Sequence, residues 1–119
     1  MLNSLNMTFG KHLKSLRESR DPKLSLRGLA KSVGLTASYL SQLESDSAKP
    51  PSEKAVRLLA DVLEEDPDVL LAMAGRVSED LKEVIMRRPR LFSSLLRELK
   101  EAPDSAVLRV VREVRDGKW

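Results

Sequence analysis

The chain has 119 residues, of which 41% are hydrophobic and 33% charged, with a net charge of +3 and no cysteine. This composition suits one small domain with a helical extension, and it excludes a disulfide framework or a thiolate metal site. The first ten residues lack the apolar run of a signal peptide, and no stretch approaches the ~20 apolar residues of a membrane span, so we expect a cytoplasmic protein without membrane contact.

Charge is distributed unevenly along the chain. Residues 1–49 carry eight bases and four acids, residues 50–75 two bases and six acids, and residues 76–119 eleven bases and eight acids. The net charges of the three segments are therefore +4, −4 and +3. A basic N-terminal third favours a face that contacts phosphates, with ordinary surface charge as the alternative.

Apolar residues recur with helical spacing along nearly the whole chain, and no stretch alternates apolar and polar residues as a strand would. A first helix carries Phe9 and Leu13 on one face and should end near Asp21-Pro22. Second and third helices are expected after the capping residues Ser25 and Thr36. Between them, Gly34 is predicted to be a left-handed turn residue.

A fourth helix is predicted after Ser52, with residues 56, 59, 60 and 63 as its buried face. A short fifth helix over residues 68–74 should follow Pro67 and close at Gly75. Residues 76–119 predict three more helices, separated at Pro89 and Pro103, with Leu81, Val84 and Ile85 inside the first of them. The chain is therefore expected to be all-α, with a boundary near Gly75 between residues 1–75 and 76–119.

The most specific pattern lies at residues 26–45, LRGLAKSVGLTASYLSQLES. Ala30 is small where two helices must approach, Gly34 follows four residues later, and Leu40 and Leu43 face inward. Such spacing is typical of two helices crossing at ~90–120° through a short turn. The outward face of the second helix is short and polar, and such a face can enter the major groove, which is ~12 Å wide.

Residues 9–75 resemble the helix-turn-helix domain of the Cro/C1 phage-repressor family, also called the XRE family. The resemblance is carried by FGKHLKSLRESR, the 26–45 motif, KPPSEKAVRLLADVL and DPDVLLAMAG. It implies a five-helix lambda-repressor-like DNA-binding domain, followed here by a three-helix C-terminal extension, in a bacterial or phage-encoded regulator. Gly28 departs from the family, which often has a charged or polar residue there, and costs roughly 1 kcal/mol of helix propensity against alanine.

The resemblance also implies roles for individual residues. The residues expected to read bases are Ala37, Ser38, Ser41 and Gln42. Those expected to contact phosphates are Ser25, Arg27, Lys31, Tyr39, Ser45 and Lys49. Arg17 and Glu44 match a structural ion pair. The alternative for the face of the second helix is an ordinary solvated surface.

The C-terminal segment carries two apolar stripes at helical spacing. The residues of these stripes, with the terminal tryptophan, are Phe92, Leu95, Leu96, Leu99, Val107, Val110, Val111, Val114 and Trp119. They pack on each other and on the N-terminal domain, or they form a dimer interface, since three short helices bury little alone. Our main hypothesis is a dimeric repressor that reads operator DNA, which is double-stranded, with helix 36–45. The alternative is an antitoxin-like or protease-responsive interaction protein whose C-terminal helices bind a partner protein, with autoregulatory DNA binding.

Other polar clusters are weaker candidates. The run Arg87-Arg88-Pro89-Arg90 is a second DNA contact or, as we favour, a charge cluster at a helix end. His12 has no second histidine or cysteine with which to share a metal, and Glu64-Glu65-Asp66 has no partner nucleophile. We therefore expect no cofactor, no metal and no enzymatic activity.

Overall fold

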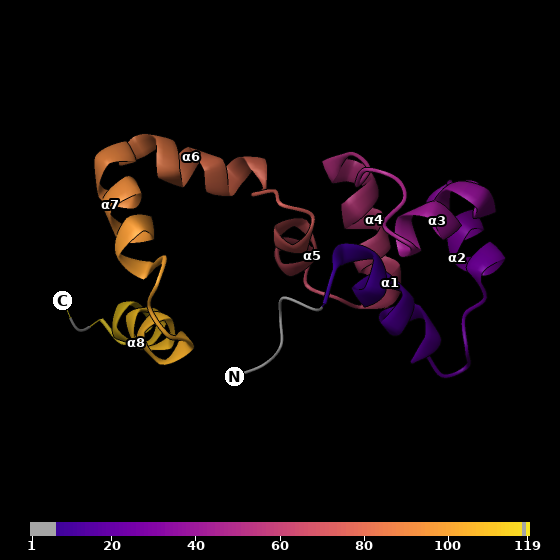
Figure 1. Cartoon of the computed structure of the whole chain (residues 1–119), viewed down its shortest axis with the longest axis horizontal. Coiled ribbons are helices and arrows are strands. Elements are labelled where there is room, and N and C mark those ends of the chain that lie inside the picture. The colour runs from indigo at the N-terminus through magenta and orange to yellow at the C-terminus, as the bar shows by residue number, and fades with distance from the viewer. Residues whose placement is uncertain (1–6, 118) are drawn as a thin grey trace. The chain divides into compact units, whose positions relative to one another are not determined.

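The computed structural model of the chain describes residues 7–117 and 119, which form α-helices and no strand (Figure 1). In chain order the helices are α1 (Phe9–Glu18), α2 (Leu26–Val33), α3 (Ala37–Glu44), α4 (Glu53–Leu63), α5 (Pro67–Met73), α6 (Glu79–Arg87), α7 (Pro89–Leu99) and α8 (Asp104–Arg115). The predicted all-α class, with five helices followed by three, is confirmed. The described residues divide into two compact units, one up to Ser78 and one from Glu79 onward.

The helix starts follow local capping chemistry. The side chains of Ser25, Thr36 and Ser52 each accept a hydrogen bond from a backbone N–H of the first turn, as predicted. Gly34 adopts a φ of 72° after α2, a conformation that glycine reaches without steric cost. The first helix ends at Glu18, earlier than expected, and the hydroxyl of Ser19 donates to a carbonyl of its last turn.

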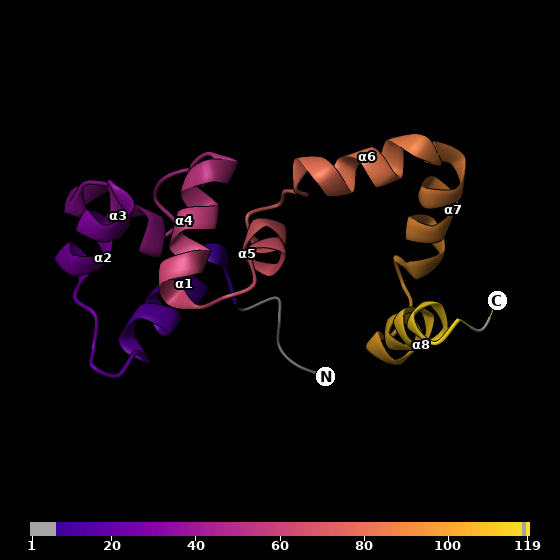
Figure 2. The ribbon, with the colours of Figure 1, turned by 180° about the vertical axis from the view of Figure 1, so that it is seen from behind.

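The core of the N-terminal unit is formed by side chains of all five helices from α1 to α5. Its largest fully buried aliphatic side chains are Leu13, Leu29, Leu40, Leu43, Val56, Leu59, Leu70 and Leu71. α1 contacts α3, α2 contacts both α3 and α4, and α4 contacts α5 (Figure 2). Each such aliphatic side chain contributes ~1.5–3 kcal/mol by leaving water, so this core holds α3 in a defined position on the surface of the unit.

The N-terminus of α1 meets the C-terminal end of α3 at Gly10. A Cβ atom at this position would lie 2.3 Å from the carbonyl oxygen of Leu43 and 2.7 Å from that of Glu44. Next to this contact, the carboxylate of Asp46 accepts the Gly10 N–H at 2.9 Å and the Thr8 hydroxyl at 2.5 Å. The approach of the two backbones therefore requires glycine, and Asp46 joins the two helix ends.

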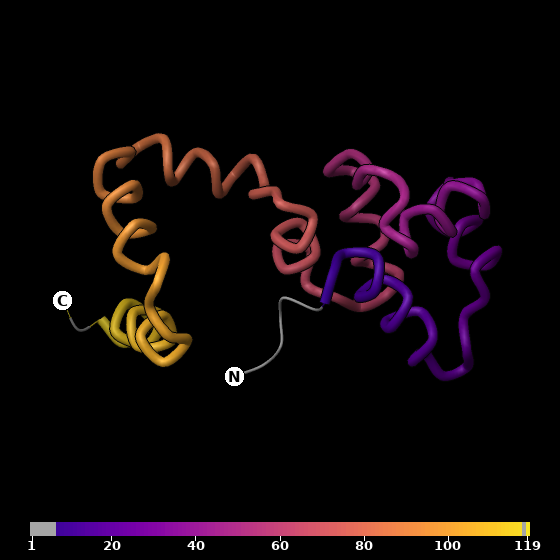
Figure 3. Tube along the Cα trace, viewed as in Figure 1, coloured from indigo at the N-terminus to yellow at the C-terminus, as the bar shows by residue number. Residues whose placement is uncertain are grey.

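The C-terminal unit is built differently. Within it the chain turns between α6, α7 and α8 near Pro89 and Pro103 (Figure 3). None of its three helices has a buried residue among those described. The expectation that Leu81 and Val84 lie inside was wrong, because they are 40% and 37% exposed. Three short helices supply no second layer to cover an apolar face.

Among the described residues, no helix combines the length and apolarity that crossing a bilayer requires.

Candidate nucleic-acid interface

The outward face of α3 is a stripe of small polar residues. Ser38, Ser41, Gln42 and Ser45 are spaced i, i+3, i+4 and i+7, which places them on one side of a helix, and all four are exposed. Within the described part of the chain, the side chains of Ser38, Ser41 and Gln42 make no hydrogen bond. These three residues therefore offer donors and acceptors to an external molecule. We call Ser38, Ser41, Gln42 and Ser45 the α3 stripe.

Ala37 lies at the edge of the stripe, one helical turn before Ser41. It is half-buried and packs against the hydrophobic core. On a helix it is about 100° away from Ser38, toward the buried Leu40 and Glu44. Its methyl group is at the edge of the interface, so hydrogen bonding to bases would come from the stripe.

The segment after α3 is held by side-chain contacts. The Tyr39 hydroxyl donates to the Lys49 carbonyl at 3.4 Å, so this tyrosine contacts the connector between α3 and α4. Ser45 caps the end of α3, where its hydroxyl donates to the Gln42 carbonyl and lies 2.7 Å from that of Ser47. Both residues thus have a local partner in addition to the phosphate role expected for them.

Three cations expected to contact phosphate are exposed. Arg27 and Lys31 are four residues apart on the same face of α2, and Lys49 lies in the connector after α3. Ser25 caps α2, and a Cβ at Gly28 would lie 3.0 Å from its hydroxyl oxygen. A side chain at this position would require the Ser25 hydroxyl to shift by a few tenths of an ångström.

Arg17 and Glu44 form a buried two-pronged ion pair. The Arg17 Nε atom is 2.7 Å from Oε2 of Glu44, and Nη2 is 3.0 Å from Oε1. Nη1 also donates to the Leu24 carbonyl at 3.1 Å. The hydrogen bonds to Glu44 raise the pKa of the Arg17 guanidinium above its ordinary value. The pair joins α1, the loop before α2 and the end of α3, so it holds α3 in place from its buried side.

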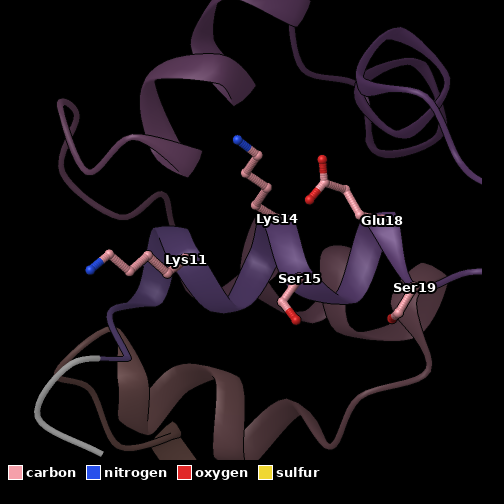
Figure 4. A pocket seen from close by; sticks show the side chains of 5 residues that line it. All are labelled: Lys11, Lys14, Ser15, Glu18 and Ser19. Carbon is pink, nitrogen blue, oxygen red and sulfur yellow. The ribbon is translucent and has the colours of Figure 1, made fainter.

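Two further polar groups of α1 lie outside the interface. His12 contacts Glu65 across 2.7 Å, and this hydrogen bond lowers the pKa of the Glu65 carboxyl below its ordinary value. A shallow hollow along α1 is lined by Lys14 and Glu18, among others, which point to the same side of the helix (Figure 4). Their opposite charges make this hollow a poor anion site. No cluster of metal-binding side chains occurs among the described residues.

The residues predicted to form a dimer interface are on the surface of the C-terminal unit. Leu96, Val111, Val114 and Trp119 are 58%, 51%, 63% and 91% exposed. Leu95 and Val107 are exposed to a lesser degree, and Phe92, Leu99 and Val110 are half-buried. The described residues of the C-terminal unit therefore leave both stripes partly exposed.

Sequence reasoning missed one contact that fixes the connector after α3. The guanidinium of Arg76 donates from Nη1 to the Pro51 carbonyl and from Nη2 to the Pro50 carbonyl, the latter at 3.2 Å. The contact joins residues about 25 positions apart, and no local pattern indicates it.

The model of a family described as "Helix-turn-helix domain" matches residues 8–73, more than half of the chain. A solved SinR protein/SinI protein complex matches with a TM-score of 0.48 and 22% sequence identity, covering 78% of this chain and 95% of that chain. No curated protein matches the chain.

Proposed function

The chain belongs to the helix-turn-helix domain family, and from this premise we propose that it is a sequence-specific regulator that reads double-stranded DNA with α3. The observation that carries the proposal is the α3 stripe, which is exposed and whose Ser38, Ser41 and Gln42 side chains have no hydrogen-bond partner within the described residues. A helix with short side chains fits the major groove, where each base pair presents a distinct set of donors and acceptors.

In this mechanism different residues supply specificity and affinity. Gln42 can bond N6 and N7 of adenine together, which is worth ~1–3 kcal/mol of discrimination. Ser38 and Ser41 discriminate less, because a hydroxyl both donates and accepts. Arg27, Lys31 and Lys49 contact phosphates, with the capped N-terminus of α2 at Ser25 as an additional anion contact. Each phosphate contact adds about 0.9 to the slope of log affinity against log salt.

The modest reading surface of one chain favours a dimer. The uncovered stripes of α7 and α8 provide the interface, and we assign them to a second copy of this chain. Residues 79–118 carry ten bases and eight acids, so like charge would not keep two copies apart. Five of the stripe residues, Leu95, Leu96, Val107, Val111 and Val114, are each 37–63% exposed, and exposed apolar patches often mark an interaction site. A two-fold dimer would read two half-sites ~34 Å apart and act in the cytoplasm as a repressor by occluding polymerase.

Selection of bound duplexes from a random pool tests DNA reading. We expect enrichment of a symmetric site with two half-sites one helical turn apart. Enrichment of no sequence would contradict specific reading, and enrichment of a single half-site would contradict the dimer on DNA. The Ser38→Ala/Gln42→Ala variant provides the control, because it should bind the unselected pool at low salt and lose the enrichment.

Light scattering of the chain without DNA tests the interface directly. We expect a dimer that Leu96→Glu converts to a monomer, since this change puts a charge into the apolar stripe. Ser94→Glu introduces the same charge on the polar face of α7 and should leave the dimer intact. A monomeric wild-type chain would overturn the assignment and would favour a separate partner protein for this face.

A further inference from the structure

The connector between α3 and α4 has three consecutive carbonyls that accept hydrogen bonds from side chains. The Lys49 carbonyl accepts from Tyr39 of α3, and those of Pro50 and Pro51 accept from Arg76. Proline has no N–H, so the connector has no donors of its own at these two positions. Its place on the domain therefore depends on side chains from elements on either side of it.

Arg76 is placed for this contact by the end of α5. Gly75 adopts a φ of 76°, and the Arg76 N–H donates to the Leu71 carbonyl at 2.9 Å, which closes the helix. From this position the half-buried Arg76 side chain contacts the connector. A planar guanidinium donates along two directions at once, so it fixes two carbonyls where a point charge would not.

The position of the connector determines that of Lys49. Lys49 precedes a proline, so its backbone is restricted to extended conformations and its side chain follows the connector. Pro51 is buried and anchors the far end. The exposed Lys49 side chain is thus held near Tyr39 of α3 by backbone contacts of the connector, one of which its own carbonyl makes.

We propose that Arg76 is a positioning residue for DNA binding, fixing the Lys49–Pro51 connector so that the Lys49 ammonium is held for a phosphate beside α3. This inference rests on the proposed function, because it assigns Arg76 to the same interface. Arg76 itself does not touch DNA. Its effect on affinity passes through Lys49, and this distinguishes it from an additional phosphate contact.

A double-mutant cycle on DNA affinity tests the proposal. The probe is a labelled duplex of the selected sequence, titrated with wild type, Arg76→Ala, Lys49→Ala and the double variant at several salt concentrations. We expect each single change to weaken binding on the order of fivefold and to lower the salt slope by no more than ~0.9. In the Lys49→Ala background, Arg76→Ala should cost less than about twofold and leave the salt slope unchanged.

If the losses in binding free energy are additive, and each of the two changes lowers the salt slope in the presence of the other, the proposal is overturned and Arg76 is a direct phosphate contact. An Arg76→Ala variant that binds like wild type would also overturn it while the proposed function stands. Failure of the wild type to bind the duplex would overturn both. Arg76→Lys keeps the charge and the fold, and should still lose affinity because it lacks the fork. Lys100→Ala, which removes an exposed charge in the other unit, should change nothing.

Discussion

Replacing Gly10 by alanine tests how closely α1 must approach α3. The added Cβ would lie 2.3 Å from the Leu43 carbonyl oxygen and 2.7 Å from both the Glu44 carbonyl oxygen and Asp46 Oδ1. Two of these atoms belong to the backbone, so α1 itself must move away. Overpacking of this kind costs ~1–3 kcal/mol. The displaced Gly10 N–H also loses a charged acceptor, which is worth ~1.5–3 kcal/mol.

Alanine recovers at most ~1 kcal/mol of helix propensity, so we expect a net loss of about 3 kcal/mol in the free energy of unfolding. For a unit of this size each kcal/mol lowers Tm by ~4–8 °C, so thermal unfolding followed by circular dichroism should show a fall of about 12–24 °C. Gly34→Ala is the matched control. It has open space and a φ of 72°, and should lose only ~1–2 kcal/mol. A Gly10→Ala variant no less stable than Gly34→Ala would refute the reasoning.

Three further changes test other parts of the structure. Glu44→Gln leaves Arg17 buried without its counter-charge and should lower the free energy of unfolding, measured in urea, by about 3 kcal/mol. The Arg17→Met/Glu44→Leu double variant removes both charges and should recover most of this loss. Equal losses in the two variants would argue against the ion pair as the cause. Because the folded pKa of Glu65 is lowered, its contribution is present above the ordinary glutamate pKa and lost as pH falls through the folded value. Glu65→Gln should therefore be less stable than wild type by up to ~1 kcal/mol near neutrality and equal to it in acid, and a difference that persists at low pH would exclude this titration as its source. Gln42→Ala should reduce the preference for the selected duplex roughly tenfold and leave the salt slope unchanged. Arg27→Ala should weaken binding to all duplexes alike and lower the salt slope by ~0.9. A lower slope in Gln42→Ala with a lost preference in Arg27→Ala would show that Gln42 contacts phosphate and Arg27 reads bases.

Features that depend on neighbouring residues were predicted well. The caps at Ser25, Thr36 and Ser52 and the left-handed Gly34 follow from the chemistry of one helix turn. The five-then-three order of helices follows from apolar spacing, because apolar residues recur about every 3.6 residues along each helix of the N-terminal unit.

Contacts between distant segments were not predictable in this way. Nothing near Gly10 in the sequence shows that two carbonyls of another helix lie against it, and nothing near Arg76 indicates Pro50 and Pro51. The base-reading role expected for Ala37 stays a prediction, and its half-burial against the core is a contact that local spacing did not indicate. In the C-terminal unit, spacing identified the apolar faces but not what covers them, which is why Leu81 and Val84 were expected inside.

The most direct test of the central claim is the ratio of affinities for the selected duplex and a scrambled duplex of the same composition. Both are titrated in the same buffer at about physiological salt, because phosphate contacts alone bind any sequence. We predict a preference of at least ~1,000-fold for wild type, within the range of specific DNA-binding proteins. Most of this preference should be lost when Ser38, Ser41 and Gln42 are all replaced by alanine. Equal affinity of the wild type for both duplexes, or an undiminished preference in the triple variant, would contradict reading by α3.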